Sequence, residues 1–215
     1  MRRYVLTGAP GAGKTSVLRA LLDLGFAIVE EAATDVIASE QRRGVDEPWR
    51  DDDFIDKIVG LQRQRERESA AVGGQAAVGG QAALDGQAGA GGRAGTGGHA
   101  AAAGQAVQVH DRSAVCTLAL ARFLGRPVTP LLAAEVTRVT RERTFETAVF
   151  LVRPIGFIER TAARRISYQD SLAFERLHEE TYREHGFEIV NVAAAGVAER
   201  AATIAGVIAS RPSAG

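Results

Sequence analysis

Eight residues near the N-terminus have the types and the spacing of a phosphate-binding loop. Their sequence is GAPGAGKT, from Gly8 to Thr15, which fits the pattern G-x-x-x-x-G-K-[ST] between an apolar run and a helical pattern. Glycines let successive backbone N–H groups approach a phosphate chain, and the following helix directs its positive end to the same place. The predicted nucleotide-binding residues are Gly8, Ala9, Pro10, Gly11, Ala12, Gly13, Lys14, Thr15 and Ser16.

Lys14 and Thr15 have the most specific roles in this motif. The lysine ammonium would neutralise charge on the β- and γ-phosphates, and the threonine hydroxyl would ligate Mg²⁺. Lys14 is one of two lysines in the chain, the other being Lys57. An ordinary glycine turn is the alternative, which the complete motif in its strand–loop–helix setting disfavours.

Polar residues stand at the end of a third apolar run, in the order His110-Asp111-Arg112-Ser113. An aspartate that ends an apolar strand beside a phosphate-binding loop is the expected second anchor for Mg²⁺, usually through water. Arg112 beside it suits a phosphate group, so the pair favours phosphoryl transfer. The alternative is that Asp111 caps the helix expected from residue 114. His110 is interpreted as a packing or surface histidine.

Acidic residues after the second apolar run and arginines after the fourth complete the candidate reaction site. Glu30 or Glu31 would face the γ-phosphate and accept a proton or a hydrogen bond from an acceptor hydroxyl, a solvated strand end being the alternative. Arginines on a mobile segment over the phosphates would stabilise transition-state charge, and a solvated basic helix end is the alternative. The arginines of that segment are Arg153, Arg160, Arg164 and Arg165.

Two further features are open to ordinary interpretations. Trp49 would stack on a base or an acceptor, or else anchor a loop in the core. Arg63, Arg65 and Arg67 lie among acidic residues, which is typical of a solvated helix face.

Strand and helix patterns alternate along the chain and position these residues. Short apolar runs predict buried strands, and apolar residues at helical spacing predict helices between them. This alternation indicates an α/β fold, a three-layer sandwich with a parallel sheet covered on both faces. Ligands of such sheets bind beyond the carboxyl ends of the strands. The predicted strands are 2–7, 26–30, 107–111, 147–152 and 187–192, and the predicted helices are 14–25, 51–69, 114–124, 129–142, 167–186 and 197–210.

The segment 70–106 interrupts this alternation. From Ala70 through Gln105 the chain repeats a six-residue unit rich in Gly, Ala and Gln, beginning with AAVGGQ. A hexapeptide β-helix needs a branched apolar residue in each rung, and the later copies have none. These residues bury too little apolar area to offset the entropy of ordering. The segment is therefore predicted to be a flexible surface insertion in a single domain of residues 1–215.

Composition limits the classes of partner. Acidic and basic residues balance at 26 each, so no net field indicates binding to nucleic acid or to an anionic membrane. A membrane span is not expected, because no run of about 18 apolar residues occurs. The single cysteine, Cys116, allows no disulfide within the chain, which fits a reducing cytoplasm. The prediction is a cytoplasmic protein whose oligomeric state the sequence leaves open.

The motifs together resemble a known family. The segments VLTGAPGAGKTSVLRAL, VEEAA, VHDRS, LALARFLG and ARRISYQDSLAFERLHEETYREHGFEIVNV are similar to the NadR-like AAA family of P-loop domains, which are close to nucleoside and nucleotide kinases. The resemblance implies a kinase-type core with strand order 2-3-1-4-5 and a lid that bears Arg160 and Arg164. It places Glu31 on the acceptor side and Asn191, in the stretch up to Ala194, against the base.

The resemblance also implies a metal-linked Asp111 and a phosphate-contacting Arg112. The resulting prediction is a kinase that transfers the γ-phosphoryl group of Mg-ATP, or of GTP, to an unidentified small-molecule hydroxyl. The alternative is a nucleotide-dependent switch with slow hydrolysis and a protein or lipid partner; a ring ATPase is disfavoured because no sensor segment is evident. The predicted catalytic residues are Lys14, Glu31, Asp111, Arg112, Arg160 and Arg164; nucleotide contacts add Arg160 and Asn191, and the Mg²⁺ ligands are Thr15 and Asp111.

Overall fold

Five short apolar segments form one parallel sheet in a computed structural model that describes residues 1–79, 107–156 and 166–211, with the backbone alone described for 71–79. Every strand pair is parallel, and the strand order is β2-β3-β1-β4-β5. The predicted fold class and strand order are therefore confirmed. The strands are β1 (Arg2–Thr7), β2 (Ala27–Val29), β3 (Val107–Asp111), β4 (Ala148–Val152) and β5 (Glu188–Val192).

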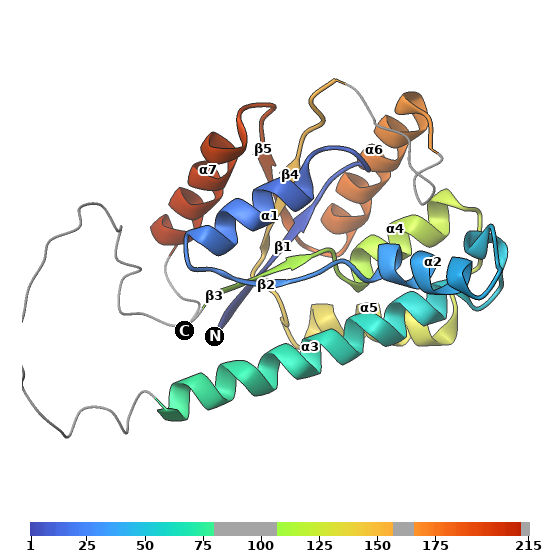
Figure 1. Ribbon diagram of the computed structural model, residues 1–215, viewed down its shortest axis with the longest axis horizontal. Helices are drawn as coiled ribbons and strands as arrows, with labels where there is room; N and C mark the ends of the chain where they lie inside the picture. Colours follow the sequence, from blue (N-terminus) through green and yellow to red (C-terminus); the bar gives the residue numbers. More distant parts are fainter. Residues whose placement is uncertain (80–106, 157–165, 212–215) are drawn as a thin grey trace, which may run out of the picture.

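Helices cover both faces of this sheet (Figure 1). Helices α1 (Lys14–Asp23) and α7 (Val197–Ser210) pack together on one face, where Leu6 and Phe150 meet them. The opposite face holds α3 (Phe54–Gly79), α4 (Ala114–Phe123), α5 (Pro130–Arg141) and α6 (Tyr168–Glu184), packed over Val5 and Val149. Neighbouring residues of β1 and β4 thus face opposite layers, as the two-residue period of a strand requires.

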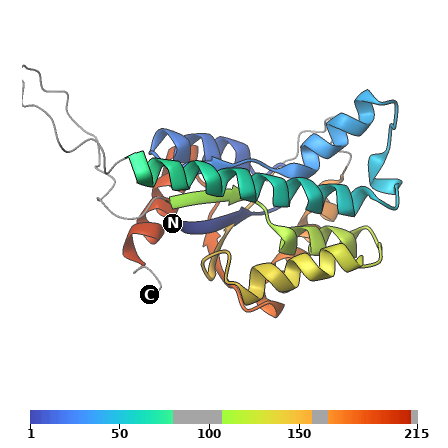
Figure 2. The same cartoon turned by 90° about the horizontal axis from the view of Figure 1, so that it is seen from below.

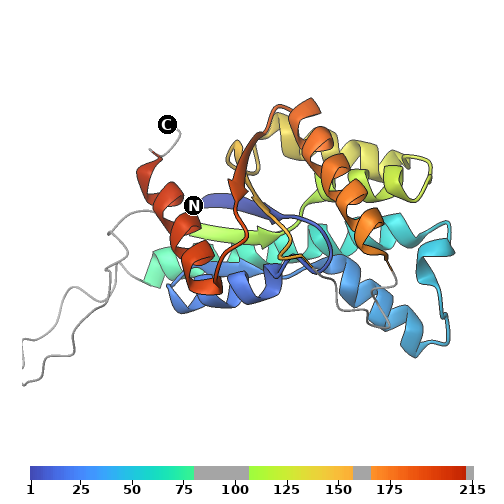
Figure 3. The same cartoon turned by 90° about the horizontal axis from the view of Figure 1, so that it is seen from above.

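The arrangement of helices brings distant parts of the chain together at one end of the sheet. Figure 3 shows α6 beside α4, and α7 beside α1. The long helix α3 runs across most of the width of the molecule in Figures 1 and 2. Loops that follow the strands therefore meet side chains of α2 (Ala32–Arg42), α4 and α6 beyond the carboxyl ends of the strands.

Side-chain caps begin two helices as their sequences predict. The Thr129 hydroxyl accepts a hydrogen bond from the Leu132 amide at 3.1 Å, and Pro130 occupies the first turn of α5. The Ser167 hydroxyl likewise accepts from the Asp170 amide at 3.1 Å at the start of α6. The Ser167 cap begins α6, which contributes side chains to the site described below.

Two helices differ from the sequence prediction. Helix α2 was not predicted, because its buried positions, Ala32, Val36 and Glu40, form a weak apolar pattern. Helix α3 begins at Phe54, after a short 3₁₀ helix (Pro48–Arg50), and continues to Gly79. Helix α3 thus extends beyond residue 69, where the predicted helix ends, and the flexibility of the segment from residue 70 stays a prediction. Residues 80–106 lie outside the described part of the chain.

Candidate functional site

The P-loop connects β1 to α1 and has the geometry that its glycines predict. Gly8 has a φ of 140°, and a Cβ atom there would lie 2.4 Å from the carbonyl oxygen of Val152 on β4. No side chain fits that gap, so the loop can pass close to β4 only with glycine at this position. Gly13 precedes the first residue of α1, Lys14. The loop therefore presents its backbone at a helix N-terminus, which is the arrangement that binds phosphate.

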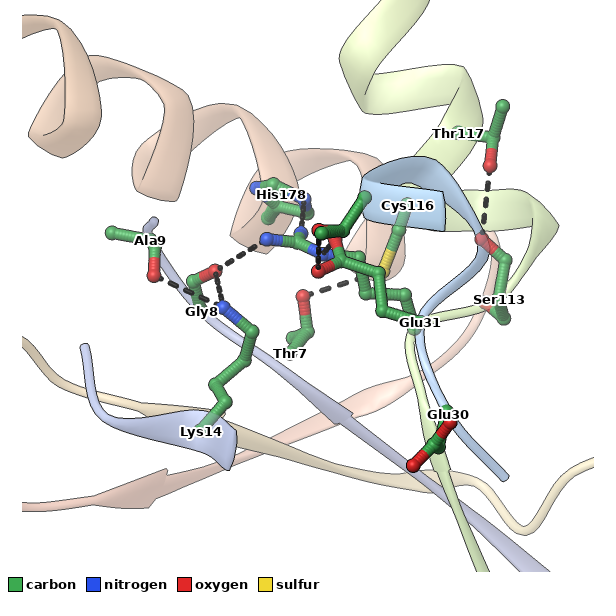
Figure 4. A network of polar contacts seen from close by, with 12 residues as sticks. Thr7, Gly8, Ala9, Lys14, Glu30, Glu31, Ser113, Cys116, Thr117 and His178 are labelled. Atoms are coloured by element: carbon green, nitrogen blue, oxygen red, sulfur yellow. Dashed lines mark hydrogen bonds and ion pairs between the residues drawn. The ribbon is translucent and has the colours of Figure 1, made fainter. Parts of the chain in front are cut away.

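Lys14 is folded back onto this loop. Its Nζ donates to the carbonyl oxygens of Gly8 at 3.2 Å and Ala9 at 3.1 Å (Figure 4). Burial, and after it the positive charge of Arg112, lower the pKa of Lys14 to about 8. A bound phosphate chain would replace these carbonyl acceptors and favour the charged ammonium.

Arg112 is the centre of the polar network beside the P-loop. It has a φ of 75°, a conformation that non-glycine residues seldom adopt. Arg112 follows β3, the strand between β2 and β1, so its side chain can reach the residues that follow both neighbouring strands. There Nε donates to Glu31 at 2.5 Å, Nη1 to His178 at 2.8 Å and Nη2 to the Gly8 carbonyl at 3.2 Å. One buried guanidinium therefore links the P-loop, the residue before α2 and helix α6.

Glu31 stands directly before α2 with its carboxylate in this network. Oε2 accepts from the Thr34 hydroxyl at 3.0 Å, while Oε1 accepts from Arg112. Burial alone would raise the pKa of Glu31, but Arg112 and then Lys14 outweigh burial and lower it. The carboxylate is therefore ionised at neutral pH. Glu30 is exposed and lies apart from this network in Figure 4, so the two adjacent acids have different surroundings.

Arg65 holds the backbone that carries Glu31. Its Nη1 donates to the carbonyl oxygens of Glu30 at 3.0 Å and Glu31 at 2.6 Å, and its guanidinium pairs with Asp35. The interpretation of Arg65 as part of a solvated helix face is therefore wrong. Sequence reasoning missed this role because the bonded residues lie more than 30 positions apart.

A cleft of about 700 Å³ opens beside these residues. Lys14, Thr15, Glu31 and Arg112 line it, together with Pro10, Gly11, Gly13 and Ser16 of the P-loop region. From there the cleft continues between α2, α3, α4 and α6, where most lining side chains are apolar. These are Ala33, Ile37, Trp49, Phe54, Ile58, Cys116, Leu120, Phe123, Leu124, Ile166 and Phe174.

Trp49 packs against the core cluster, as the anchor interpretation predicts, and it also lines the cleft, where its stacking on a base or an acceptor stays a prediction. Polar groups in the same part of the cleft are few. The Thr117 hydroxyl donates to Gln62 Oε1 at 3.0 Å, which orients that amide beside the aromatic rings. The cleft has the size and the mainly apolar lining of small-molecule sites.

Comparison with known proteins gives the family. A family model described as an AAA domain matches residues 3–78 and 91–200. The chain belongs to this AAA domain family. Membership and the P-loop geometry make this AAA domain a P-loop phosphotransferase or ATPase. Its finer likeness to NadR-like members stays a prediction.

One similar solved structure is that of deoxyadenosine kinase from M. mycoides with the products dCMP and a flexible dCDP bound. It is 12% identical, the match covers 97% of this chain and 100% of that chain, and the TM-score is 0.48. The comparison of this chain with curated proteins found no match. Within the described residues, no helix is both long enough and apolar enough to cross a bilayer.

Asp111 ends β3 outside the lining of the cleft, beside a separate small cavity, and it does not cap the following helix. Ser113 precedes α4 as its N-cap residue, so the capping alternative for Asp111 is wrong. Asp111 is 7% exposed, and among the described residues its buried Oδ1 atom has no hydrogen-bond partner. Burial raises the pKa of this carboxyl to about 6, against the lowering effect of Lys14.

These residues fit a Mg²⁺ ion that also binds phosphate. The exposed Thr15 side chain faces the cleft, and the unpaired Asp111 Oδ1 is an oxygen acceptor near Lys14. No group of three or more His, Cys, Asp or Glu side chains in the described ranges could hold a metal. Mg²⁺ needs no such cage, because waters and nucleotide oxygens usually complete its coordination.

Arg200 of α7 is a structural contact of the P-loop that sequence reasoning missed. Its guanidinium donates to three backbone carbonyl oxygens, those of Ala12 at 2.7 Å, Arg153 at 2.9 Å and Ala193 at 3.1 Å. The side chain is 3% exposed, and burial lowers its pKa. Arg200 thereby joins the P-loop to the ends of β4 and β5.

Some predicted site residues are not brought to the cleft. Arg153 pairs with Glu175 at 2.6 Å and Glu179 at 3.0 Å, both on α6. Asn191 lies within β5, in register with Leu151, and its side chain is exposed. The predicted lid residues Arg160, Arg164 and Arg165 lie outside the described residues. His110 is a buried packing residue, edge-on to Phe145 with 5.0 Å between ring centroids, as predicted.

Proposed function

We propose that the protein is a small-molecule kinase that transfers the γ-phosphoryl group of Mg-ATP to a hydroxyl of a metabolite. The observation that carries this proposal is the position of Glu31. Its carboxylate lines one cleft together with Lys14 and Thr15 of the P-loop and with an apolar region between α2, α3, α4 and α6. A switch that only hydrolyses its nucleotide has no need of this second region.

Phosphate binding is assigned to the P-loop backbone and to Lys14. The loop amides and the N-terminus of α1 would hold the β- and γ-phosphates, with Lys14 as their nearest cation. Thr15 and Asp111 would hold Mg²⁺, directly and through water, and the ion would supply charge neutralisation at the β- and γ-oxygens. Arg112 would add its positive charge on the side of the acceptor.

Glu31 would act as the base toward the acceptor. The acceptor hydroxyl transfers its proton to Glu31 while its oxygen bonds to the γ-phosphorus. The bond from that phosphorus to the β,γ-bridging oxygen breaks, and ADP leaves with the electron pair. The pairing of Glu31 with Arg112 and Thr34 keeps this carboxylate ionised and limits its rotamers.

The apolar part of the cleft would bind the body of the acceptor. Its aromatic residues, Trp49, Phe54, Phe123 and Phe174, suit a flat or apolar group, while Gln62 and Thr117 provide a polar contact. Desolvation in this region also strengthens the electrostatic contacts of Glu31 and Arg112.

A metabolite panel scored by ADP release tests the proposal. Nucleosides, vitamins and sugars are each mixed with the protein, Mg-ATP and a coupled ADP assay. We expect at least one acceptor to raise ADP release well above the rate with water alone. Lys14→Ala should remove this stimulated activity, because the nucleotide loses its main cation.

The matched pair Glu31→Gln and Glu30→Gln separates chemistry from nucleotide binding. Glu31→Gln should lower stimulated turnover by about 10²–10⁴-fold, the range for a general base, and leave Mg-ATP affinity near that of the wild type. Glu30→Gln should change neither, since Glu30 is exposed and outside the network.

Two results would overturn the kinase proposal. One is a panel without any stimulated ADP release, together with tighter binding of GTP than of ATP, which would favour the nucleotide-dependent switch. The other is an equal loss of nucleotide affinity in Lys14→Ala and Glu31→Gln, which would remove the acceptor-side role of Glu31.

A further inference from the structure

Helix α6 contributes one buried histidine to the network of Arg112. His178 is 0% exposed, and its ring packs against Phe174 with 4.2 Å between ring centroids. Its Nδ1 lies 2.8 Å from the carbonyl oxygen of Phe174, and its Nε2 lies 2.8 Å from Arg112 Nη1. Both ring nitrogens are therefore engaged, one by backbone and one by the guanidinium.

The chemistry of these two partners determines the protonation state of the ring. A carbonyl oxygen only accepts, so Nδ1 must carry the hydrogen. A guanidinium only donates, so Nε2 must present its lone pair. His178 is therefore a neutral imidazole, and a proton on Nε2 would place two cations in contact at a buried position. Burial and then Arg112 both lower the pKa of His178, with Lys14 a smaller cause in the same direction, which agrees with this geometry.

Arg112 needs this acceptor because of its unusual position. Its backbone has a left-handed φ, and it follows β3, which lies between β2 and β1, so its side chain contacts Glu31 on one side and Gly8 on the other. Two of its three nitrogens bond to Gly8 and Glu31, and His178 is the acceptor for the third. The ring of Phe174 lies 5.9 Å below the guanidinium carbon. His178 therefore determines where the guanidinium plane lies relative to the carboxylate.

We propose that His178 is a positioning residue whose neutral Nε2 acceptor holds Arg112 against Glu31 in the geometry that phosphoryl transfer requires. The inference rests on the kinase reaction proposed above, on which its kinetic test depends. Its spectroscopic test does not depend on that reaction. Within the described part of the chain, His178 is not among the residues that line the cleft. It acts through Arg112, in the way that outer groups orient the ligands of a reactive centre.

Two amide substitutions separate this role from simple packing. His178→Gln places an oxygen near the position of Nε2, so it retains an acceptor for Arg112 and does not titrate. His178→Asn retains a donor near the position of Nδ1 for the Phe174 carbonyl but is too short to reach Arg112. A packing role predicts that the asparagine variant is at least as active as the glutamine variant.

We expect the opposite order. With Mg-ATP and the acceptor found in the panel, His178→Asn should lower kcat by about 10–100-fold, the range for orienting groups, while the Kd of Mg-ATP changes little. His178→Gln should recover most of that loss. His185→Gln is the matched control: its Nδ1 also bonds to a backbone carbonyl of α6, that of Thr181 at 2.8 Å, and it does not line the cleft.

Nitrogen-15 NMR of the histidine side chains tests the same contact without a kinase assay. The His178 signals, assigned by their loss in His178→Gln, should show the neutral Nδ1–H form at pH 7 and still at pH 5.5. In Arg112→Met the midpoint of their titration should move to higher pH. An Nε2–H form, or a midpoint that Arg112→Met leaves unchanged, would overturn the inference even if the protein is a kinase. If no acceptor is found but these signals behave as expected, the contact stands and the kinase proposal fails.

Discussion

Lys14 and Lys57 are the two lysines of the chain, and their surroundings differ. Lys14 is 7% exposed on the P-loop, where burial lowers its pKa to about 8. Lys57 forms ion pairs with Glu40 and Asp53 away from the cleft. A lysine that loses its proton near pH 8 is unusual, and a bound triphosphate would stabilise its charged form.

Nucleotide affinity should therefore depend on pH through Lys14. In the free protein the ammonium is charged below about pH 8, so affinity should be constant there. Above pH 8 the free protein must take up a proton to bind, so the Kd of Mg-ATP should rise by up to about tenfold per pH unit. Calorimetric titrations between pH 7 and 9.5 measure this slope, and Lys57→Gln should reproduce it. A Kd that is flat across this range would contradict the low pKa of Lys14.

The contacts of Glu31 and Arg112 depend on residues that are distant in the sequence. Each stands in a short polar group after a predicted strand, and the types of these groups indicate phosphoryl transfer. Their mutual pairing, at 2.5 Å and 81 positions apart, has no local signal. His178 was not predicted at all, because a histidine within a helix of mixed polarity is an ordinary feature of a sequence.

At the scale of elements, α7 has a function that its sequence does not indicate. Its Arg200 binds three carbonyl oxygens from three segments, which no shorter side chain could reach together. A guanidinium suits this task because its donors diverge in one plane. Helix α7, which is distant from the P-loop in the sequence, therefore holds the P-loop through hydrogen bonds of Arg200.

Arg200→Met should destabilise both the fold and the nucleotide site. It leaves the carbonyls of Ala12, Arg153 and Ala193 without this donor, and each buried unsatisfied group costs about 1–3 kcal/mol. Thermal unfolding with and without Mg-ATP should show a lower Tm and a smaller shift on adding the nucleotide. Arg211→Met is the control, since Arg211 forms an exposed pair with Glu188 at 2.7 Å. Equal melting of both variants would contradict a supporting role for Arg200.

At the scale of the whole molecule, buried neutral histidines make stability sensitive to acid. Burial and Arg3 lower the pKa of His110 to about 3, and burial and Arg112 lower that of His178. In the unfolded chain both titrate near 6.5, so that state binds more protons as the pH falls below this value. The stability that they contribute is complete above about pH 7 and is lost as the pH falls toward the folded pKa values. Asp111 opposes this loss below its pKa of about 6.

His178→Gln should remove one of these two contributions. Between pH 7.5 and 5.5 each such histidine should lower the free energy of unfolding by about 1.4 kcal/mol. Urea unfolding at the two pH values should therefore show a smaller loss for His178→Gln than for the wild type. The same loss in both proteins would mean that His178 is not held neutral in the folded state.

Much of the architecture follows from patterns that act over a few residues. Three features depend only on residues that are close in the sequence: the alternation of strands and helices, the Thr129 and Ser167 caps, and the P-loop motif. They are local because backbone dihedrals and hydrogen-bonding groups interact within one or two turns. Their predicted outcomes are confirmed in β1, β3, α5 and α6. The start and end of α3 were wrong, since helix boundaries depend on weak preferences that packing readily overrides.

By itself the sequence determined that an α/β domain with a P-loop would place polar residues beyond the ends of its strands. Only the tertiary structure decided which of them meet: Arg112 joins Glu31, Gly8 and His178, while Arg153 turns to α6. The physical reason is the distance along the sequence over which each kind of interaction acts. Strand period, helix spacing and glycine conformation are properties of neighbours in the chain, whereas buried charges are paired across the sheet, where their desolvation must be compensated by partners distant in sequence.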